Sequence, residues 1–205
     1  MNKDDFVIFA EPGDFPVDKV KRKNALLKKF HCECETTEER QAVLKELFGA
    51  VGRNPRVTPL FYCDLGFNIF IGDDFYSNYN LTILDCAKVT IGNNCYIADN
   101  VGIYAVGHPT DRLLRRVDIE YGAPVVIGDD VWIGGHTVIN PGVTIGDNVV
   151  IGSGSVVTRD IESGVVAAGN PCRVIRKIDE RDRKYIFKDI EYPPELIEKH
   201  YGKNK

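Results

Sequence analysis

His108 combines reactive chemistry with an unusual position. It stands in Gly107-His108-Pro109, within a stretch (residues 105–124) that also holds three arginines and two prolines. An imidazole with its ordinary pKa of about 6.5 is mostly neutral at pH 7 and can accept a proton from a hydroxyl group. Glu120, later in the same stretch, could fix the tautomer of the ring, as could a backbone carbonyl. The pair predicts general-base chemistry.

The segment His31-Cys32-Glu33-Cys34 resembles a metal-binding cluster. A second ligand pair at zinc spacing does not follow, so we expect no metal site, and none of the six cysteines lies in a nucleophile motif. The cysteines are then reduced thiols, some of them buried. His136 lies in a regular stretch and is expected at the surface or in a groove, and His31 and His200 lie outside the region expected to carry chemistry.

A period of six residues must position these groups. The aliphatic residues recur as Ile127, Ile133, Ile139, Ile145, Ile151 and Val157, and glycine follows at 128, 134, 146 and 152. The fourth place after each aliphatic is small or β-branched: Val131, Thr137, Val143, Val149, Ser155 and Ile161. This period fits neither a lone helix nor a lone strand, and is typical of a β-helix built from hexapeptides.

Three hexapeptides would make one triangular coil, so that residues eighteen apart stack and the aliphatic residues point inward. We expect the Gly or Asn after each aliphatic to adopt the backbone conformation of a tight corner. Polar pairs such as Asp129-Asp130 and Asp147-Asn148 should lie at turns that face solvent. Most of these glycines therefore have a structural purpose.

The period begins near Leu65 and continues at Ile71, Ser77, Ile83 and Val89. It slips by two residues to Ile91, Ile97 and Ile103, stops over residues 105–124, and fades after Ile161. A long interruption in a repeat array usually forms a loop on one face, often the functional face. Residues 105–124 are therefore expected to form a loop inserted into the β-helix.

The first sixty residues lack the repeat and predict two helices. Residues 18–30 place Val20, Leu26, Leu27 and Phe30 on one side, and Thr36 with Glu39 forms a capping box before a second helix. That helix should bury Val43, Leu44, Leu47 and Phe48 and end at Gly49 or Gly52. Such helices would cover the open end of the β-helix.

The fold class is thus mainly β, in three parts. We predict a helical cap over residues 1–60, a β-helix over 61–178 with the inserted loop 105–124, and a tail over 179–205 with a short helix from Pro193-Pro194-Glu195. A net charge of −4 gives nucleic-acid binding no electrostatic support. No apolar run suits a membrane span, and the N-terminus lacks the pattern of a signal peptide, so the expected location is the cytoplasm.

Several motifs together resemble one known family. They are Asn78-Tyr79-Asn80-Leu81-Thr82-Ile83-Leu84-Asp85, Gly107-His108-Pro109, Asp130-Val131-Trp132-Ile133-Gly134, Ile139-Asn140-Pro141-Gly142-Val143-Thr144-Ile145-Gly146, Val166-Ala167-Ala168-Gly169-Asn170-Pro171 and the closing Cys172-Arg173. Over about residues 5–187 the chain resembles the hexapeptide-repeat acetyltransferases, in particular the maltose and galactoside O-acetyltransferase group. The resemblance implies a left-handed β-helix, a homotrimer with active sites between subunits, and direct acetyl transfer from acetyl-CoA to a sugar hydroxyl with His108 as the base.

The resemblance also implies an acceptor site. The matching positions are Asp64, Tyr76, Asn78, Asp85 and Tyr96, and an upstream acid could be Glu11 or Asp14. An amide such as that of Asn78 can both donate to and accept from sugar hydroxyls. Galactoside enzymes carry Ser where this chain has Asp64, and a second Asp where it has Cys86. Asp64 is closer to the maltose branch, and both departures put a preference for galactosides in doubt.

The positions that the resemblance assigns to acetyl-CoA run towards the C-terminus. They are Trp132 for the pantetheine arm, Gly135 for the oxyanion, and Gly152, Ser153, Thr158, Arg159, Arg173 and Arg176 along the cofactor. Arginines suit phosphates because their hydrogen bonds are charge-assisted. Lys177 adds to this basic end, and no metal is required.

Three alternatives remain beside this interpretation. An antibiotic-modifying acetyltransferase would share the fold, although such relatives usually lack a two-helix cap. A β-helix carbonic anhydrase would need three histidine ligands, and the repeat region holds only His108 and His136. A non-catalytic β-helix scaffold would not need Asn78, His108 and Trp132 together.

Overall fold

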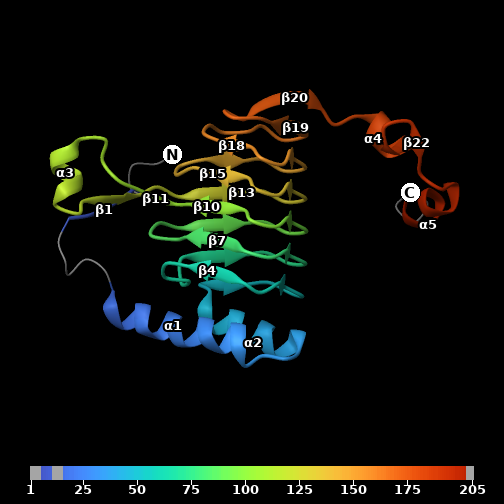
Figure 1. Cartoon of the computed structure of the whole chain (residues 1–205). Coiled ribbons are helices and arrows are strands. Elements are labelled where there is room, and N and C mark those ends of the chain that lie inside the picture. Colours follow the sequence, from blue (N-terminus) through green and yellow to red (C-terminus); the bar gives the residue numbers. More distant parts are fainter. Residues whose placement is uncertain (1–5, 11–15, 202–205) are drawn as a thin grey trace.

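The computed structural model describes residues 6–10 and 16–201 as a three-sided β-helix with a helical cap, a projecting loop and a C-terminal tail (Figure 1). Two helices, α1 (Val17–Cys32) and α2 (Thr37–Leu47), lie across one end of the β-helix. Within these described residues, no helix is both long enough and apolar enough to cross a membrane.

Three parallel sheets form the sides of the prism, and each coil contributes one strand to each sheet. The β7 face contains β4 (Phe61–Cys63), β7 (Leu81–Leu84), β10 (Gly102–Tyr104), β15 (Val138–Ile139) and β18 (Val156–Val157). The β8 face contains β2 (Ala50–Val51), β5 (Ile69–Ile71), β8 (Val89–Ile91), β13 (Val125–Ile127) and β16 (Thr144–Ile145). The β9 face contains β3 (Arg56–Val57), β6 (Tyr76–Ser77), β9 (Tyr96–Ile97), β14 (Trp132–Ile133), β17 (Val150–Ile151), β19 (Val165–Ala168) and the antiparallel β20 (Arg173–Lys177).

Three edges join these faces. The loop edge, between the β7 and β8 faces, includes residues 64–68, 85–88 and 105–124. The ladder edge, between the β8 and β9 faces, includes residues 72–75, 92–95, 128–131 and 146–149. The Asn78 edge, between the β9 and β7 faces, includes residues 78–80, 98–101, 134–137 and 152–155.

The stacking distance along the sequence changes from coil to coil. Residues eighteen apart pair in the later coils, as Ile127 does with Ile145, and this part of the prediction is confirmed. In the first coils the partners are twenty apart, as for Ile71 and Ile91, and thirty-six apart across the inserted loop, as for Ile91 and Ile127. Because Cys63 pairs with Ile83, the repeat passes through Cys63 rather than Leu65. The additional residues all lie on the loop edge.

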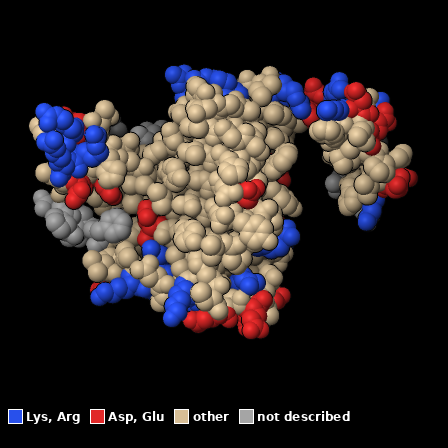
Figure 2. All heavy atoms as spheres, viewed as in Figure 1, with Lys and Arg blue, Asp and Glu red and all other residues tan. Residues whose placement is uncertain are grey.

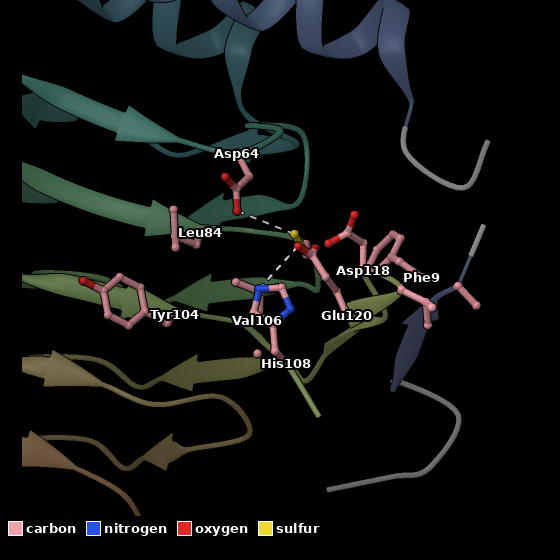
Figure 3. A pocket seen from close by; sticks show the side chains of 12 residues that line it. Phe9, Asp64, Leu84, Tyr104, Val106, His108, Asp118 and Glu120 are labelled. Carbon is pink, nitrogen blue, oxygen red and sulfur yellow. Dashed lines mark hydrogen bonds and ion pairs between the residues drawn. The ribbon is translucent and has the colours of Figure 1, made fainter. Parts of the chain in front are cut away.

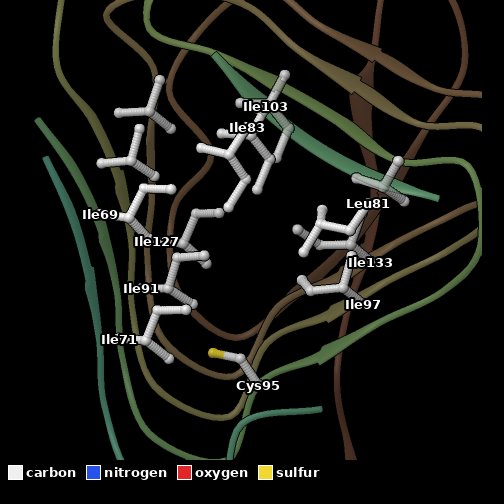
Figure 4. Close-up of a cluster of buried hydrophobic side chains, with 14 of the residues drawn as sticks. Ile69, Ile71, Leu81, Ile83, Ile91, Cys95, Ile97, Ile103, Ile127 and Ile133 are labelled. Carbon is white, nitrogen blue, oxygen red and sulfur yellow. The ribbon is translucent and has the colours of Figure 1, made fainter. Parts of the chain in front are cut away.

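The interior is a column of aliphatic side chains. All six aliphatics of the predicted repeat from Ile127 to Val157 are buried, and so are the six residues at the fourth places. Figure 4 shows three stacks pointing inward, one from each face: Ile71, Ile91 and Ile127; Ile83 and Ile103; and Ile97 and Ile133. Burial of this column is the main force that holds the coils together.

The glycines that follow the aliphatic residues have another purpose than the one expected. A Cβ atom on Gly128 would lie within 3.0 Å of the backbone of the next coil, and the same is true at Gly72, Gly92, Gly134 and Gly146. Left-handed backbone occurs two residues later instead, at positions such as Asp74, Asn94 and Asn148 with φ of 51–56°. These glycines permit close stacking of coils, and the Asp or Asn two residues later makes the turn.

The helical cap agrees with the sequence in most respects. Leu26, Leu27 and Phe30 of α1 are buried, as are Val43, Leu44, Leu47 and Phe48 in and after α2. The capping box between Thr36 and Glu39 is present, and α2 ends at Leu47, before either glycine. The prism begins earlier than residue 61, because β2 and β3 already pair with β5 and β6.

Two segments leave the prism. The inserted loop carries β11 (Val106–Gly107), α3 (Arg112–Arg116) and β12 (Glu120–Gly122), and it pairs with the N-terminal strand β1 (Val7–Phe9). The tail carries α4 (Glu180–Lys184), a hairpin of β21 (Tyr185–Phe187) and β22 (Ile190–Glu191), and α5 (Pro194–Tyr201), the helix expected after Pro193. Figure 1 shows the loop and the tail on opposite sides of the prism.

Candidate active site

A pocket of about 720 Å³ lies on the loop edge (Figure 3). The inserted loop, two edge segments and strand β1 all contribute to its walls. The lining residues are Phe9, Ala10, Asp64, Leu84, Cys86, Tyr104, Val106, Gly107, His108, Val117, Asp118 and Glu120. Three carboxyl groups and one imidazole therefore share a single cavity. Titratable groups gathered in one pocket are typical of a site that transfers protons.

A small antiparallel sheet holds the loop in place. Strand β12 pairs with β11 on one side and β1 on the other, so the N-terminal strand brings Phe9 to the pocket. Gly107 leaves room for the ring of Tyr121, because a Cβ atom there would lie 2.6 Å from that ring. That ring stacks on Phe6 at a centroid distance of 5.4 Å. His108 thus directly follows β11, which is held in place by its pairing with β12.

The two nitrogens of His108 have different neighbours. Nδ1 lies 3.3 Å from the carbonyl oxygen of Ile119, and Nε2 lies 3.6 Å from Oε1 of Glu120. A carbonyl can only accept, so the first contact places the proton on Nδ1 and leaves Nε2 as the basic atom. Of the two kinds of group that could fix the tautomer, the backbone carbonyl of Ile119 lies against Nδ1, and Glu120 faces the other nitrogen. About half of the imidazole surface is exposed to the pocket side and solvent.

Asp64 and Cys86 form a second polar pair in the pocket. The Cys86 thiol donates a hydrogen bond to Oδ2 of Asp64 at 3.5 Å. Burial raises the pKa of the Cys86 thiol and also that of the Asp64 carboxyl. The thiol therefore stays protonated as a donor at neutral pH, and it fixes one oxygen of Asp64. Asp64 thus lines the pocket with one oxygen fixed, and its contact with an acceptor stays a prediction.

Asp85 is not exposed to the pocket. Its side chain is fully buried, Oδ1 accepts the N–H of Leu65 at 2.8 Å, and Oδ2 accepts the N–H of Asn68 at 3.3 Å. Burial raises the pKa of Asp85, and these backbone hydrogen bonds oppose the rise. The expectation of an acceptor contact is corrected, because the carboxyl instead ties together two loop-edge segments and so positions Asp64.

A second set of predicted residues lies away from this pocket. Asn78, Gly135, Gly152 and Ser153 follow strands of the β9 face and share the Asn78 edge. Outward on the β9 face, Tyr76, Tyr96 and Trp132 stand in register on neighbouring strands. The rings of Tyr76 and Tyr96 are 5.8 Å apart, and Trp132 is 55 % exposed. Within one chain, the structure does not bring this set to His108.

The last predicted residues lie on the final coils. Thr158 and Arg159 follow β18 on the loop edge and are exposed, and Arg173 begins β20. Arg176 forms a bidentate ion pair with Asp182 at 2.6 and 2.7 Å, and that pairing lowers the pKa of Asp182 to about 2. Arg176 is therefore engaged by a carboxylate, whereas Arg173 donates to the backbone carbonyl of Cys172.

The other candidate residues fall outside the pocket. His31 accepts the N–H of Phe61 at Nε2, 3.1 Å away, so it joins the cap to the first coil, and burial lowers its pKa. Across residues 6–10 and 16–201, no group of three potential metal ligands lies together. His136 is exposed at a turn, with Nε2 3.8 Å from Asp99. Glu11 and Asp14 lie outside the residues that the structure describes.

Sequence reasoning missed several parts of the pocket. Phe9 and Ala10 come from a segment without any periodic signal, and Asp118 was hidden in the loop. Cys86 was noticed only as a departure from a family pattern, and its contact with Asp64 depends on the stacking of two coils. The spacing of the repeat places Cys86 among the additional residues of the loop edge, and that position is a signal that could have found it.

Comparison with known proteins places this geometry in a family. Residues 124–159 match the family described as bacterial transferase hexapeptide (six repeats). The chain is 51 % identical over 174 residues to a galactoside O-acetyltransferase of Escherichia coli K12, covering 85 % of this chain and 86 % of that one. A galactoside acetyltransferase solved in complex with coenzyme A has a TM-score of 0.87 and 48 % identity, over 91 % of this chain and 94 % of that chain. A maltose O-acetyltransferase from Clostridium difficile 630 has a TM-score of 0.78 and 50 % identity, over 80 % and 88 %.

The fold and these similarities define the class: the chain is a hexapeptide-repeat acyltransferase with a left-handed parallel β-helix. Within that class it belongs to the galactoside and maltose O-acetyltransferase group. The resemblance stated from the sequence is confirmed.

Proposed function

We propose that the chain transfers the acetyl group of acetyl-CoA to a hydroxyl group of a sugar, with His108 as general base. The observation that carries this proposal is the pocket in which the Nδ1 proton of His108 points to a backbone carbonyl and Nε2 is left as a base. The similar enzymes named above act, by their names, on galactosides and maltose, and one was solved with coenzyme A. Direct transfer within a ternary complex needs no nucleophilic side chain.

The reaction requires one proton relay. Nε2 of His108 takes the proton of the acceptor hydroxyl while that oxygen attacks the thioester carbonyl of acetyl-CoA. The tetrahedral intermediate collapses with cleavage of the C–S bond, and the proton passes from Nε2 to the departing thiolate. The products are the acetyl ester and coenzyme A, and His108 is neutral again.

Glu120 stabilises the charged state of this relay. Its carboxylate lies 3.6 Å from Nε2, which is too long for a hydrogen bond but close enough to attract the proton while it is on its way from the acceptor to the thiolate. Negative charge develops on the carbonyl oxygen of the thioester at the same moment. The backbone N–H of Gly135 is our candidate donor of a hydrogen bond to that oxygen. The role of Glu120 in the proposal is thus electrostatic.

A complete site requires a second copy of the chain. Asp64, His108 and Glu120 lie on the loop edge, whereas Asn78 and Gly135 lie on the Asn78 edge. Packing the loop edge of one prism against the Asn78 edge of the next would place both sets around one acceptor. A closed ring of three such contacts gives the homotrimer with shared sites that the sequence resemblance implies.

The groups proposed for acetyl-CoA extend to the final coils along both edges, with Gly135, Gly152 and Ser153 on the Asn78 edge and Thr158 and Arg159 on the loop edge. Trp132 offers an exposed ring on the β9 face, next to Gly135, Gly152 and Ser153. Thr158, Arg159 and Arg173 supply a hydroxyl and two guanidinium groups at the phosphate end. Arg176 can join them only by leaving Asp182, so we assign it a lesser part than Arg173.

An acceptor screen tests the proposal. The purified chain is incubated with acetyl-CoA and with maltose, glucose, a thiogalactoside, chloramphenicol or a streptogramin, and release of free thiol is followed. We expect thiol release that depends on a sugar and disappears in His108→Ala. Release with an antibiotic alone would move the acceptor to another class, and no release with any acceptor would contradict the proposal.

A further inference from the structure

A second pocket, of about 320 Å³, lies between α1 and the first coil on the loop edge. Its volume is at the lower end of the range for small-molecule sites, about 300–1,000 Å³. Three cationic and four apolar side chains line it: Lys19, Arg22, Lys23, Leu26, Leu47, Leu65 and Phe67. No carboxyl group of the described residues lines this pocket. The acceptor and cofactor sites proposed above use none of these side chains.

The three cations lie on one face of α1, because positions 19, 22 and 23 are three and four residues apart. In the part of the chain that the structure describes, no ion pair joins any of them to a carboxylate. Nζ of Lys19 stands over the ring of Phe67 at 4.0 Å, and Nη2 of Arg22 donates to the backbone carbonyl of Glu46 at 2.7 Å. Figure 2 shows Lys and Arg gathered over α1 at the capped end, and Asp and Glu over the neighbouring α2. One wall of the pocket is therefore positively charged.

Lys23 is the least exposed lysine of α1. It is partly buried, whereas the other lysines of the helix are exposed: Lys19, Lys21, Lys28 and Lys29. A lysine withdrawn from water is usually paired, yet no hydrogen bond or ion pair engages its ammonium among residues 6–10 and 16–201. Burial raises the pKa of Asp64, and the hydrogen bond from Cys86 and the charge of Lys23 oppose that rise. Lys23 thus brings an unpaired charge near the acceptor pocket.

The second pocket borders the acceptor pocket. Asp64 lines the first pocket, and Leu65, the next residue, lines the second. The buried carboxyl of Asp85 accepts the N–H of Leu65 at 2.8 Å. Gly66, at a φ of +83°, lets the turn pass close to Leu47, which would lie 2.6 Å from a Cβ atom there. These contacts fix the wall between the two pockets in advance, and a preformed wall lowers the cost of binding.

We propose that the second pocket binds an anionic group on the aglycone of the acceptor, the part of a glycoside other than the sugar. The sugar would lie beside Asp64, and an apolar aglycone would extend over Leu65 and place its acid group at Lys19 and Lys23. A partly desolvated ammonium gains most from an anion, and the apolar floor suits the body of the aglycone. Acetyl-CoA phosphates are not the expected occupant, because Arg173 lies at the opposite end of the prism from α1 (Figure 1).

This inference rests on the proposed function, since it names the class of glycoside that the same site prefers. Aryl glycosides of the sugar favoured in the acceptor screen test it. The phenyl, 4-carboxyphenyl and 4-(aminomethyl)phenyl glycosides share one body and carry no charge, a negative charge and a positive charge at neutral pH. We expect the KM of the 4-carboxyphenyl glycoside to be at least about tenfold below that of the phenyl glycoside. The KM of the aminomethyl compound should be no lower than that of the phenyl glycoside.

Lys19→Met with Lys23→Met removes two charges and keeps long side chains of good helix propensity, and circular dichroism checks the fold. The ratio of the KM for the phenyl glycoside to that for the 4-carboxyphenyl glycoside should then fall to about one. The matched control is Lys21→Met with Lys28→Met, on the same helix but outside the pocket, and it should keep the wild-type ratio. A wild-type ratio near one, or a high ratio that survives in the double variant of the pocket, would overturn the inference and leave the proposed function standing.

Isothermal titration calorimetry with aryl glucosides, in the absence of acetyl-CoA, separates binding from acetyl transfer. The 4-carboxyphenyl glucoside should bind more tightly than the phenyl glucoside, and only while Lys19 and Lys23 are present. Benzoate, which carries the acid group without a sugar, should bind at least about tenfold more weakly than the 4-carboxyphenyl glucoside. Equal binding of benzoate would assign the pocket to a free aromatic acid and overturn its link to the acceptor. Charge-dependent binding without thiol release from any sugar would support the pocket and contradict the proposed function.

Discussion

The ladder edge and the loop edge both border the β8 face, yet they are built in opposite ways. On the ladder edge a side-chain oxygen of one coil accepts the backbone N–H of the coil before it: Asp73 from Arg53, Asn93 from Asp73, Asp129 from Asn93, Asp147 from Asp129, and Ser163 from Asp147. On the loop edge the connection varies from a short turn to the twenty-residue loop 105–124. The ladder edge thus repeats one kind of hydrogen bond from coil to coil, whereas the loop edge contains the additional residues.

The difference shows how a repeat can carry chemistry without losing its stability. Hydrogen bonds along the ladder edge satisfy backbone groups in each coil in turn, and the aliphatic column needs only that the strands stay in register. Insertions on a single edge leave both conditions intact. The residues of the loop edge therefore need not follow the repeat. They place Asp64, Cys86 and His108 in one pocket.

The largest predicted effect comes from the base on the loop edge. His108→Asn keeps a donor that can reach the Ile119 carbonyl but removes the basic nitrogen. We expect kcat to fall by about 10²–10⁴-fold, with the fold and oligomer unchanged. Steady-state kinetics measures this, and a drop in His108→Asn much smaller than in His108→Ala would mean that positioning, rather than proton transfer, is the contribution of His108.

On the ladder edge the predicted effect is on stability. In Gly128→Ala the new Cβ would press on the backbone and carboxylate of Asp147. Asp147 cannot move without breaking the hydrogen bond that it accepts from the N–H of Asp129. We expect a loss of about 1–3 kcal/mol in the free energy of unfolding, with activity per folded molecule retained. Urea denaturation measures it. The control on the same edge is Gly164→Asn, where φ is +74° and nothing lies within 4 Å, and it should be nearly neutral.

The acceptor and cofactor contacts should separate by their Michaelis constants. Asp64→Asn keeps the shape of the side chain but removes a charged acceptor, so the KM for the sugar should rise about tenfold, equivalent to ~1.4 kcal/mol. The KM for acetyl-CoA should not change. Arg173→Ala should show the reverse pattern, and equal changes in both constants for either variant would contradict the assignment.

The smallest effect should come from the anchor of the tail. The Arg176 guanidinium holds the pKa of Asp182 at about 2, below its usual value near 4, so the pair stabilises the tail above pH 4 and loses this contribution as the pH falls from 4 to 2. Compared with Asp182→Asn, the wild type should be more protected by about 0.5–1 kcal/mol at pH 6 and equal at pH 2. Hydrogen exchange of α4, corrected for intrinsic rates, measures the difference, and a constant difference across this range would be inconsistent with the ion pair.

The sequence predicted those parts of the molecule that depend on neighbours in the chain. The period from Ile127 to Val157 predicts the buried column, and the Thr36–Glu39 pair predicts the start of α2. The eighteen-residue stacking failed in the first coils, because periodicity reports the spacing of inward residues and not the edge that receives extra ones. The interruption of the repeat predicts a loop that carries His108, and His108 does line the pocket on the loop edge, while its role as a base stays a prediction.

The rest depends on contacts between distant segments. The Asp85 carboxyl accepts hydrogen bonds from the backbone of Leu65 and Asn68 one coil earlier, and the Arg176 guanidinium forms an ion pair with Asp182 in the tail. Both resemble ligand contacts in a sequence, since a carboxylate or guanidinium does not reveal its partner. The Ile119 carbonyl beside His108 has no sequence signal at all, because every residue carries a carbonyl group.

Mixing two inactive variants tests most directly the central claim that each active site combines the loop edge of one copy with the Asn78 edge of another. His108→Ala and Asn78→Ala chains are co-expressed in equal amounts, and acetyl transfer is measured against each variant alone. Random assembly should restore about one quarter of wild-type activity, because a site is complete when an Asn78→Ala chain supplies His108 and a His108→Ala chain supplies Asn78. If the mixed oligomer is no more active than its parts, the site lies within one chain and the account is contradicted.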